Sequence, residues 1–159
     1  MSITVVRGDI FLTSSHALAI GLNAAGRLEV APVFTALHDR YPVFVADYHK
    51  RGRAGQLTPG SMWVWPDSQP WLVGLIVRET PQGAARLRFV EAALLNLVKE
   101  WEREGLRSLA MMQPGNGHDW PVIRNLVTHH LGPLPLPITL YETYIPGLVA
   151  ETNDNLDQG

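Results

Sequence analysis

Three largely apolar runs constrain the fold of this chain more than any other feature of its sequence. They occupy residues 17–22, 71–77 and 108–112. A strand that is buried on both faces has such a continuous run, whereas a strand with one solvated face alternates apolar and polar residues. Segments with helical spacing of apolar residues lie between the runs. The sequence therefore predicts an α/β fold, a three-layer α/β/α architecture with a mixed, mostly parallel central sheet.

The other elements follow from local patterns and from helix-breaking residues. Further strands are predicted at residues 3–6, 61–65 and 138–142. Helices are predicted at residues 31–51, 85–104 and 121–130. Pro42 is expected to split the first helix in two, and Gly105 is expected to end the second.

Length and composition indicate one globular domain. The chain has 159 residues, of which 46% are hydrophobic and 18% charged, as in an ordinary folded protein. We expect the domain to span residues 1–145. The polar, acidic segment 146–159 is predicted to be a flexible tail.

Several classes of function are disfavoured by the composition. The net charge is −2, which gives no general attraction for nucleic acids. The basic run from Lys50 to Arg53 is either a local patch or a solvated helix end. The absence of cysteine excludes thiol catalysis, and no cofactor or metal site is expected. No leader or membrane-spanning run is found, so a cytoplasmic location is expected and no membrane partner.

Ligands of open α/β sheets bind at the loops that follow the carboxyl ends of the strands. Two such loops begin with polar residues. Asp9 follows the first strand, where its carboxylate could accept a hydrogen bond from an exocyclic amine or could cap a turn. Asn23 ends the second strand, where its amide suits a pair of sugar hydroxyls or closes a turn on Gly26.

The third loop, residues 114–119, is rich in glycine. The run Gly115, Asn116 and Gly117 could direct backbone amides at a diphosphate, or could simply form a tight turn. His118 and Asp119 follow as a possible acid–base pair, although Asp119 could equally cap the next helix. The paired His129 and His130 lack the neighbouring ligands that a metal requires.

The order of these features resembles the macrodomain family, in particular the branch that contains DarG and the terminal ADP-ribose glycohydrolase TARG1. The resemblance covers about residues 3–142. It starts with Val5-Val6-Arg7-Gly8-Asp9-Ile10 and continues with Asn23-Ala24-Ala25-Gly26. Tyr41-Pro42 and Gly55-Gln56-Leu57-Thr58-Pro59-Gly60 match patterns typical of this branch, and Gly115-Asn116-Gly117 with Asp119-Trp120 matches its phosphate loop.

The resemblance implies a binding site for ADP-ribose or a related nucleotide, or for ADP-ribosylated DNA or protein. It implies that Asp9, with Ile10 beside it, contacts the adenine and that Asn23 contacts the distal ribose, next to Gly26. It places residues 115–118 at the phosphates and makes Asp119 the catalytic position.

The sequence departs from the family at two important places. The glycine-rich loop of the family reads Arg27-Leu28-Glu29-Val30-Ala31-Pro32 here, and Glu29 would bring a negative charge towards a diphosphate unless it points away. The nucleophilic lysine of similar enzymes corresponds to Arg78. Arginine stays protonated, so it cannot form a covalent sugar adduct.

Three functions are consistent with these residues. The first is binding of ADP-ribose without turnover, which the lost lysine and the lost glycines favour. The second is hydrolysis of an ADP-ribose conjugate, with Asp119 as the catalytic group and Arg78 steadying phosphate or developing charge. The third is an interaction domain in which the cleft is filled.

Overall fold

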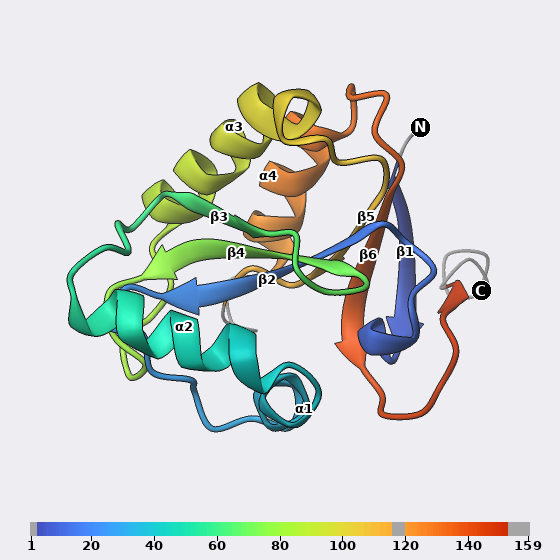
Figure 1. Cartoon of the computed structure of the whole chain (residues 1–159). Coiled ribbons are helices and arrows are strands. Elements are labelled where there is room, and N and C mark those ends of the chain that lie inside the picture. Colours follow the sequence, from blue (N-terminus) through green and yellow to red (C-terminus); the bar gives the residue numbers. More distant parts are fainter. Residues whose placement is uncertain (1–2, 116–119, 153–159) are drawn as a thin grey trace.

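The computed structural model describes residues 3–115 and 120–152 of the chain. Its centre is a seven-stranded sheet with the order β3-β4-β2-β5-β6-β1-β7 (Figure 1). The strands are β1 (Ile3–Gly8), β2 (Ala17–Asn23), β3 (Met62–Trp65), β4 (Trp71–Arg78), β5 (Leu109–Met112), β6 (Ile138–Tyr144) and β7 (Glu151–Thr152). The two edge strands β3 and β7 are antiparallel to their neighbours, and the other pairs are parallel.

Four α-helices cover the two faces of this sheet (Figure 1). α3 (Leu87–Glu104) and α4 (Trp120–Leu131) lie on one face, and α1 (Pro32–Arg40) and α2 (Pro42–Arg53) lie on the other. A 3-10 helix, η1 (Ile10–Leu12), follows β1.

The side chains of β2 show why its sequence is continuously apolar. Ala17 and Ala19 pack into the core beneath α3 and α4, while Leu18, Ile20 and Leu22 pack into the core beneath α1 and α2. Successive side chains of a strand point to opposite faces. A central strand between two helical layers therefore needs an apolar residue at nearly every position.

The predicted α/β architecture is confirmed, and the elements agree with the sequence prediction to within a few residues. The helix over 31–51 is split at Tyr41 with Pro42 opening α2. Gly105 ends α3 in the left-handed conformation, with φ of 85°, which glycine adopts without the steric cost of a Cβ.

Two short elements lie in segments for which no regular structure is predicted. They are η1 and β7, and β7 lies within the segment 146–159 for which a flexible tail is predicted. Residues 153–159 are outside the described part, so the flexibility of that end stays a prediction. None of the helices in the described ranges combines the length and apolarity needed to cross a bilayer.

Candidate functional site

A cavity of about 390 Å³ opens at the carboxyl ends of β2, β4, β5 and β6. This is the edge at which ligands bind in open α/β sheets. Apolar and polar groups share its wall. The lining residues are Ile20, Gly21, Glu29, Val33, Phe34, Arg78, Met112, Gln113, Pro114, Gly115, Glu142, Thr143 and Tyr144.

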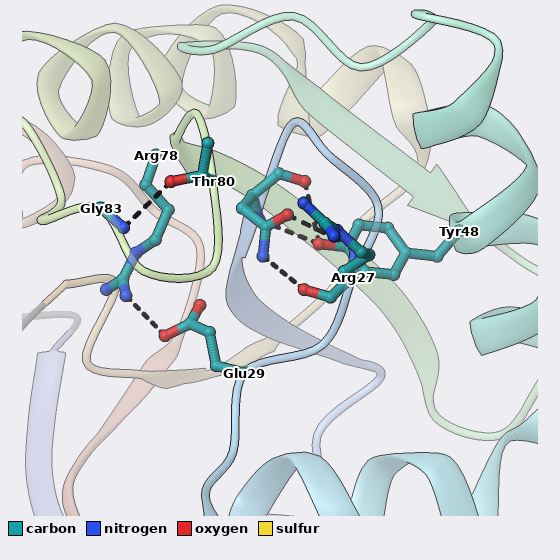
Figure 2. Close-up of polar contacts among 7 residues, drawn as sticks. Arg27, Glu29, Tyr48, Arg78, Thr80 and Gly83 are labelled. Carbon is teal, nitrogen blue, oxygen red and sulfur yellow. Dashed lines mark hydrogen bonds and ion pairs between the residues drawn. The ribbon is translucent and has the colours of Figure 1, made fainter.

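An ion pair between Glu29 and Arg78 lies in the wall of this cavity. Glu29 Oε1 lies 2.5 Å from Arg78 Nη1. Figure 2 shows the carboxylate facing the guanidinium. The two side chains are 18% and 9% exposed. Arg78 is the last residue of β4, and Glu29 belongs to the loop between β2 and α1. Glu29, the residue expected to oppose a diphosphate unless it points away, therefore has its carboxylate in the cavity wall.

Burial shifts the pKa of Glu29 more than the neighbouring Arg78 guanidinium does. Burial raises the pKa of the Glu29 carboxyl above its ordinary value of 4.5, and the Arg78 guanidinium offsets only part of the rise. Desolvation of a buried ion pair commonly costs about as much as the mutual attraction returns. The pair is thus a specific arrangement of charge and not a large source of stability.

The second carboxylate of the wall, Glu142, is paired from the side of α4. Its Oε1 accepts hydrogen bonds from Arg124 Nη1 at 2.6 Å and from Trp120 Nε1 at 3.4 Å. Its main-chain carbonyl accepts a hydrogen bond from the Gln113 side chain. Each of these two carboxylates therefore has an arginine beside it, and of the two arginines Arg78 lines the cavity whereas Arg124 does not.

Asn23 is fully buried behind the cavity wall and does not line it. Its Nδ2 donates to the Arg27 carbonyl at 2.6 Å, and its Oδ1 accepts from the Arg27 amide at 3.4 Å. The Tyr48 hydroxyl accepts a hydrogen bond from the backbone amide of Asn23 at 3.0 Å and donates one to the backbone carbonyl of Asn23 at 2.8 Å. Figure 2 shows Arg27 next to Tyr48, and Glu29 apart from them and facing Arg78. Asn23 thus shapes the loop that carries Glu29.

Asp9 is 3% exposed, and both of its carboxylate oxygens bind backbone amides. Oδ1 accepts from Phe11 N at 3.0 Å, and Oδ2 accepts from Gly147 N at 2.9 Å. The Asp9 amide donates to the Leu148 carbonyl at 2.7 Å. Asp9 therefore caps η1, as one of its two interpretations predicts. Its other partners, Gly147 and Leu148, lie near the end of the described chain.

The predicted site residues are distributed unevenly around the cavity. Arg78 and Gly115 line it, whereas Asp9, Ile10, Asn23 and Gly26 are buried and do not line it. Asn116, Gly117, His118 and Asp119 lie outside the described residues, so their predicted roles stay predictions.

Several lining residues were not singled out by sequence reasoning. Phe34, Gln113, Glu142 and Tyr144 all lie in the wall. The signal for Glu142 and Tyr144 was their place at the carboxyl end of a predicted strand, the rule that identified Asp9 and Asn23. Phe34 carried no such signal, because an aromatic residue in a helix usually packs in the core.

The chemistry available in the described wall is recognition by charge, hydrogen bonds and apolar contact. Arg78 offers a planar, permanently charged donor that suits phosphate oxygens. Phe34 and Tyr144 offer aromatic surface, and Gln113 and Thr143 offer hydrogen bonds. Within residues 3–115 and 120–152 there is no cluster of three His, Cys, Asp or Glu side chains that could hold a metal ion.

Comparison with solved structures identifies this architecture. The macrodomain of Thermus aquaticus DarG is 24% identical, with a TM-score of 0.80 over 88% of this chain and 97% of that chain. The macrodomain of Mycobacterium tuberculosis DarG is 21% identical, with a TM-score of 0.78 over 91% and 98%. Thermosipho africanus DarTG, solved in complex with ADP-ribose, is 17% identical, with a TM-score of 0.81 over 92% of this chain and 42% of that chain.

No protein-family model and no curated protein sequence matches the chain. The similarity therefore rests on structure, and at these identities it concerns the fold. The chain has a macrodomain fold, as the order of its sequence motifs predicted.

Proposed function

We propose that this protein binds ADP-ribose, free or attached to a macromolecule, in the 390 Å³ cavity and holds it without a covalent intermediate. The observation that carries the proposal is the position of Arg78 in the wall of that cavity, at the carboxyl end of β4. The cavity volume lies within the range of about 300–1,000 Å³ that is usual for small-molecule sites.

The lining supports a ligand with both an anionic and an aromatic part. The Arg78 guanidinium provides the positive charge for phosphate oxygens, and Phe34 and Tyr144 provide surface for a base. Thermosipho africanus DarTG, which shares the fold, was solved in complex with ADP-ribose. We extend that ligand to this chain as part of the proposal.

Binding is favoured over hydrolysis because the position of the expected nucleophile carries an arginine. Lys50 and Lys99 are the lysines of the chain, and both are exposed on helices outside the cavity lining. A deprotonated amine is therefore missing from the described wall, and Arg78 cannot supply one. A mechanism through Asp119 and a water molecule is the alternative that a turnover assay addresses.

Calorimetry with ADP-ribose tests the proposal directly. We expect micromolar binding that is lost in Thr143→Trp, because an indole at this exposed position of the wall would occupy the cavity. Thr4→Trp is the matched control, since Thr4 is exposed at the opposite end of the neighbouring strand β1. An absence of heat at millimolar ADP-ribose would refute the proposal and favour a domain with a filled cleft.

Incubation with ADP-ribosylated DNA and protein separates a reader from a hydrolase. We expect both substrates to remain intact while they bind. Release of ADP-ribose would overturn the non-catalytic part of the proposal, and its loss in Asp119→Ala would then assign catalysis to that residue.

A further inference from the structure

A second cavity, of about 510 Å³, adjoins the same loop between β2 and α1. Ala25, Gly26 and Arg27 line it from the loop, and His49, Gly52 and Arg53 line it from the last turn of α2. The end of α2 lies beside the carboxyl end of β2 in Figure 1. This cavity shares no residue with the one that contains Arg78.

The close approach of the loop to α2 depends on two glycines. A Cβ on Gly52 would lie 2.4 Å from the Ala25 carbonyl oxygen and 2.4 Å from the Gly26 Cα. Gly26 has φ of 71°, in the left-handed region, and a Cβ there would lie 2.7 Å from the Tyr48 carbonyl oxygen. The contact brings Arg27 to the same cavity as His49 and Arg53.

The charged groups of this cavity are all cationic or can become so. Neither Arg27, His49 nor Arg53 forms a salt bridge within the described residues. The neighbouring Arg51 contrasts with them. Its Nε lies 2.7 Å from Asp47 Oδ2, and its guanidinium lies over the Trp63 ring at 4.8 Å.

His49 lies among these positive charges. Burial lowers the pKa of the His49 imidazole, and Arg53 and then His38 lower it further. The groups around His49 are Arg53 on its own helix, His38 beside Asp39 on α1, Arg27 across the cavity and the Tyr48 ring at 6.1 Å.

A helix C-terminus attracts cations, but that effect does not account for the cluster. The last carbonyls of α2 are already satisfied, because those of Lys50, Arg51 and Gly52 accept hydrogen bonds from the amides of residues 54–56. Arg27 also belongs to a different segment of the chain. The cavity thus collects more positive charge than the partial charge of a helix end requires.

We propose that the cavity lined by Arg27, His49 and Arg53 is a phosphate-binding subsite, separate from the cavity proposed for ADP-ribose. The two guanidiniums can each donate to phosphate oxygens, and the imidazole adds a third donor when it is protonated. The chemistry suits either a phosphomonoester or a phosphodiester of a molecule that lies across the outside of the β2–α1 loop.

Nuclear magnetic resonance of the His49 ring tests this site in the full chain. Inorganic phosphate is titrated at low ionic strength while the pKa of His49 is followed, in the wild type and in Arg53→Gln. Lys50→Gln is the matched control, because it removes the same charge from the same helical turn, and Lys50 does not line the cavity. Arg53 is exposed and has no salt bridge in the described chain, so its variant is expected to fold.

Bound phosphate is expected to raise the pKa of His49, because its negative charge favours the protonated ring. Arg53→Gln should weaken phosphate binding about tenfold, the effect of losing one charge-assisted hydrogen bond, and Lys50→Gln less than twofold. Equal weakening by both variants, or an unchanged pKa of His49 at tens of millimolar phosphate, would overturn the proposal.

A dinucleotide without a terminal phosphate gives the second arm. A shift of the His49 resonance by this diester as well as by inorganic phosphate assigns the site to either ester, and a shift by inorganic phosphate alone assigns it to monoesters. These readouts need no ADP-ribose, so they succeed or fail independently of the function proposed above.

Discussion

Replacement of Glu29 by glutamine removes one negative charge from the proposed ADP-ribose cavity while keeping the shape of the side chain. In the wild type, Glu29 Oε1 lies 2.5 Å from Arg78 Nη1. A diphosphate that binds Arg78 must come close to this carboxylate or displace it. We therefore expect Glu29→Gln to bind ADP-ribose more tightly than the wild type.

The size of the gain follows from the burial of the pair. Two unit charges about 6 Å apart interact by about 3 kcal/mol at an effective dielectric constant of ~20, which corresponds to about 100-fold in Kd. Glu29 is 18% exposed, so solvent reduces this repulsion, and we expect tightening by about 10- to 100-fold. The free energy of unfolding should fall by up to about 3 kcal/mol, because the substitution leaves the Arg78 guanidinium, whose side chain is 9% exposed, without the negative charge of Glu29.

The dependence on pH provides a second test of the same reasoning. Burial raises the pKa of Glu29 in the folded protein, so this carboxylate takes up a proton at a higher pH than an ordinary glutamate does. Protonation removes the negative charge that opposes binding of the diphosphate. Wild-type affinity for ADP-ribose should therefore increase from pH 8 towards pH 5, whereas Glu29→Gln should show a flatter profile.

Calorimetry at several pH values and a thermal denaturation curve measure these quantities. Glu79→Gln is the control, because Glu79 is exposed next to Arg78 in the chain but does not line the cavity. An affinity for Glu29→Gln that is equal to or weaker than the wild-type value would refute the idea that this carboxylate opposes the ligand.

Three other substitutions test the packing around the site by urea denaturation. Arg78→Gln leaves a buried carboxylate without its guanidinium and should lower the free energy of unfolding by up to about 3 kcal/mol. It should also abolish ADP-ribose binding. An unchanged free energy of unfolding would contradict the electrostatic argument. Tyr48→Phe removes a hydroxyl that bonds both the amide and the carbonyl of Asn23, so the loss should be about 1–3 kcal/mol, and a loss below about 0.5 kcal/mol would argue that water replaces it. Gly52→Ala places a Cβ 2.4 Å from the Ala25 carbonyl and should destabilise the fold by at least about 1 kcal/mol; full stability would show that the β2–α1 loop can yield.

The layers of the fold could be predicted from the sequence because buried strands and helix ends have characteristic local residue patterns. The apolar runs over 17–22 and 71–77 lie in β2 and β4, and Pro42 and Gly105 mark helix ends. Each of these signals depends on a residue and its immediate neighbours, which a single sequence contains.

The candidate site was harder to predict because it depends on segments that are distant in sequence. Glu29 and Arg78 are separated by 49 positions, and only the folded chain shows that the glutamate points at the arginine. Asp9 was equally consistent with capping and with ligand binding, and its second capping partner, Gly147, lies 138 positions away. Glu142 was overlooked, since its pairing with Arg124 arises from the contact of β6 with α4.

The hydrogen bonds of Asp9 to Gly147 and Leu148 have a consequence for where the domain ends. Residues 147–152 cross the carboxyl end of β1 and then pair with it as β7. A chain cut after residue 145, the boundary that the sequence predicts, would remove one amide partner from the Asp9 carboxylate and the acceptor of the Asp9 amide. The shortened protein would therefore present a more exposed aspartate at the edge of the sheet. Residues 147–152 therefore shield Asp9 from solvent, and deleting them would change which groups Asp9 can bind.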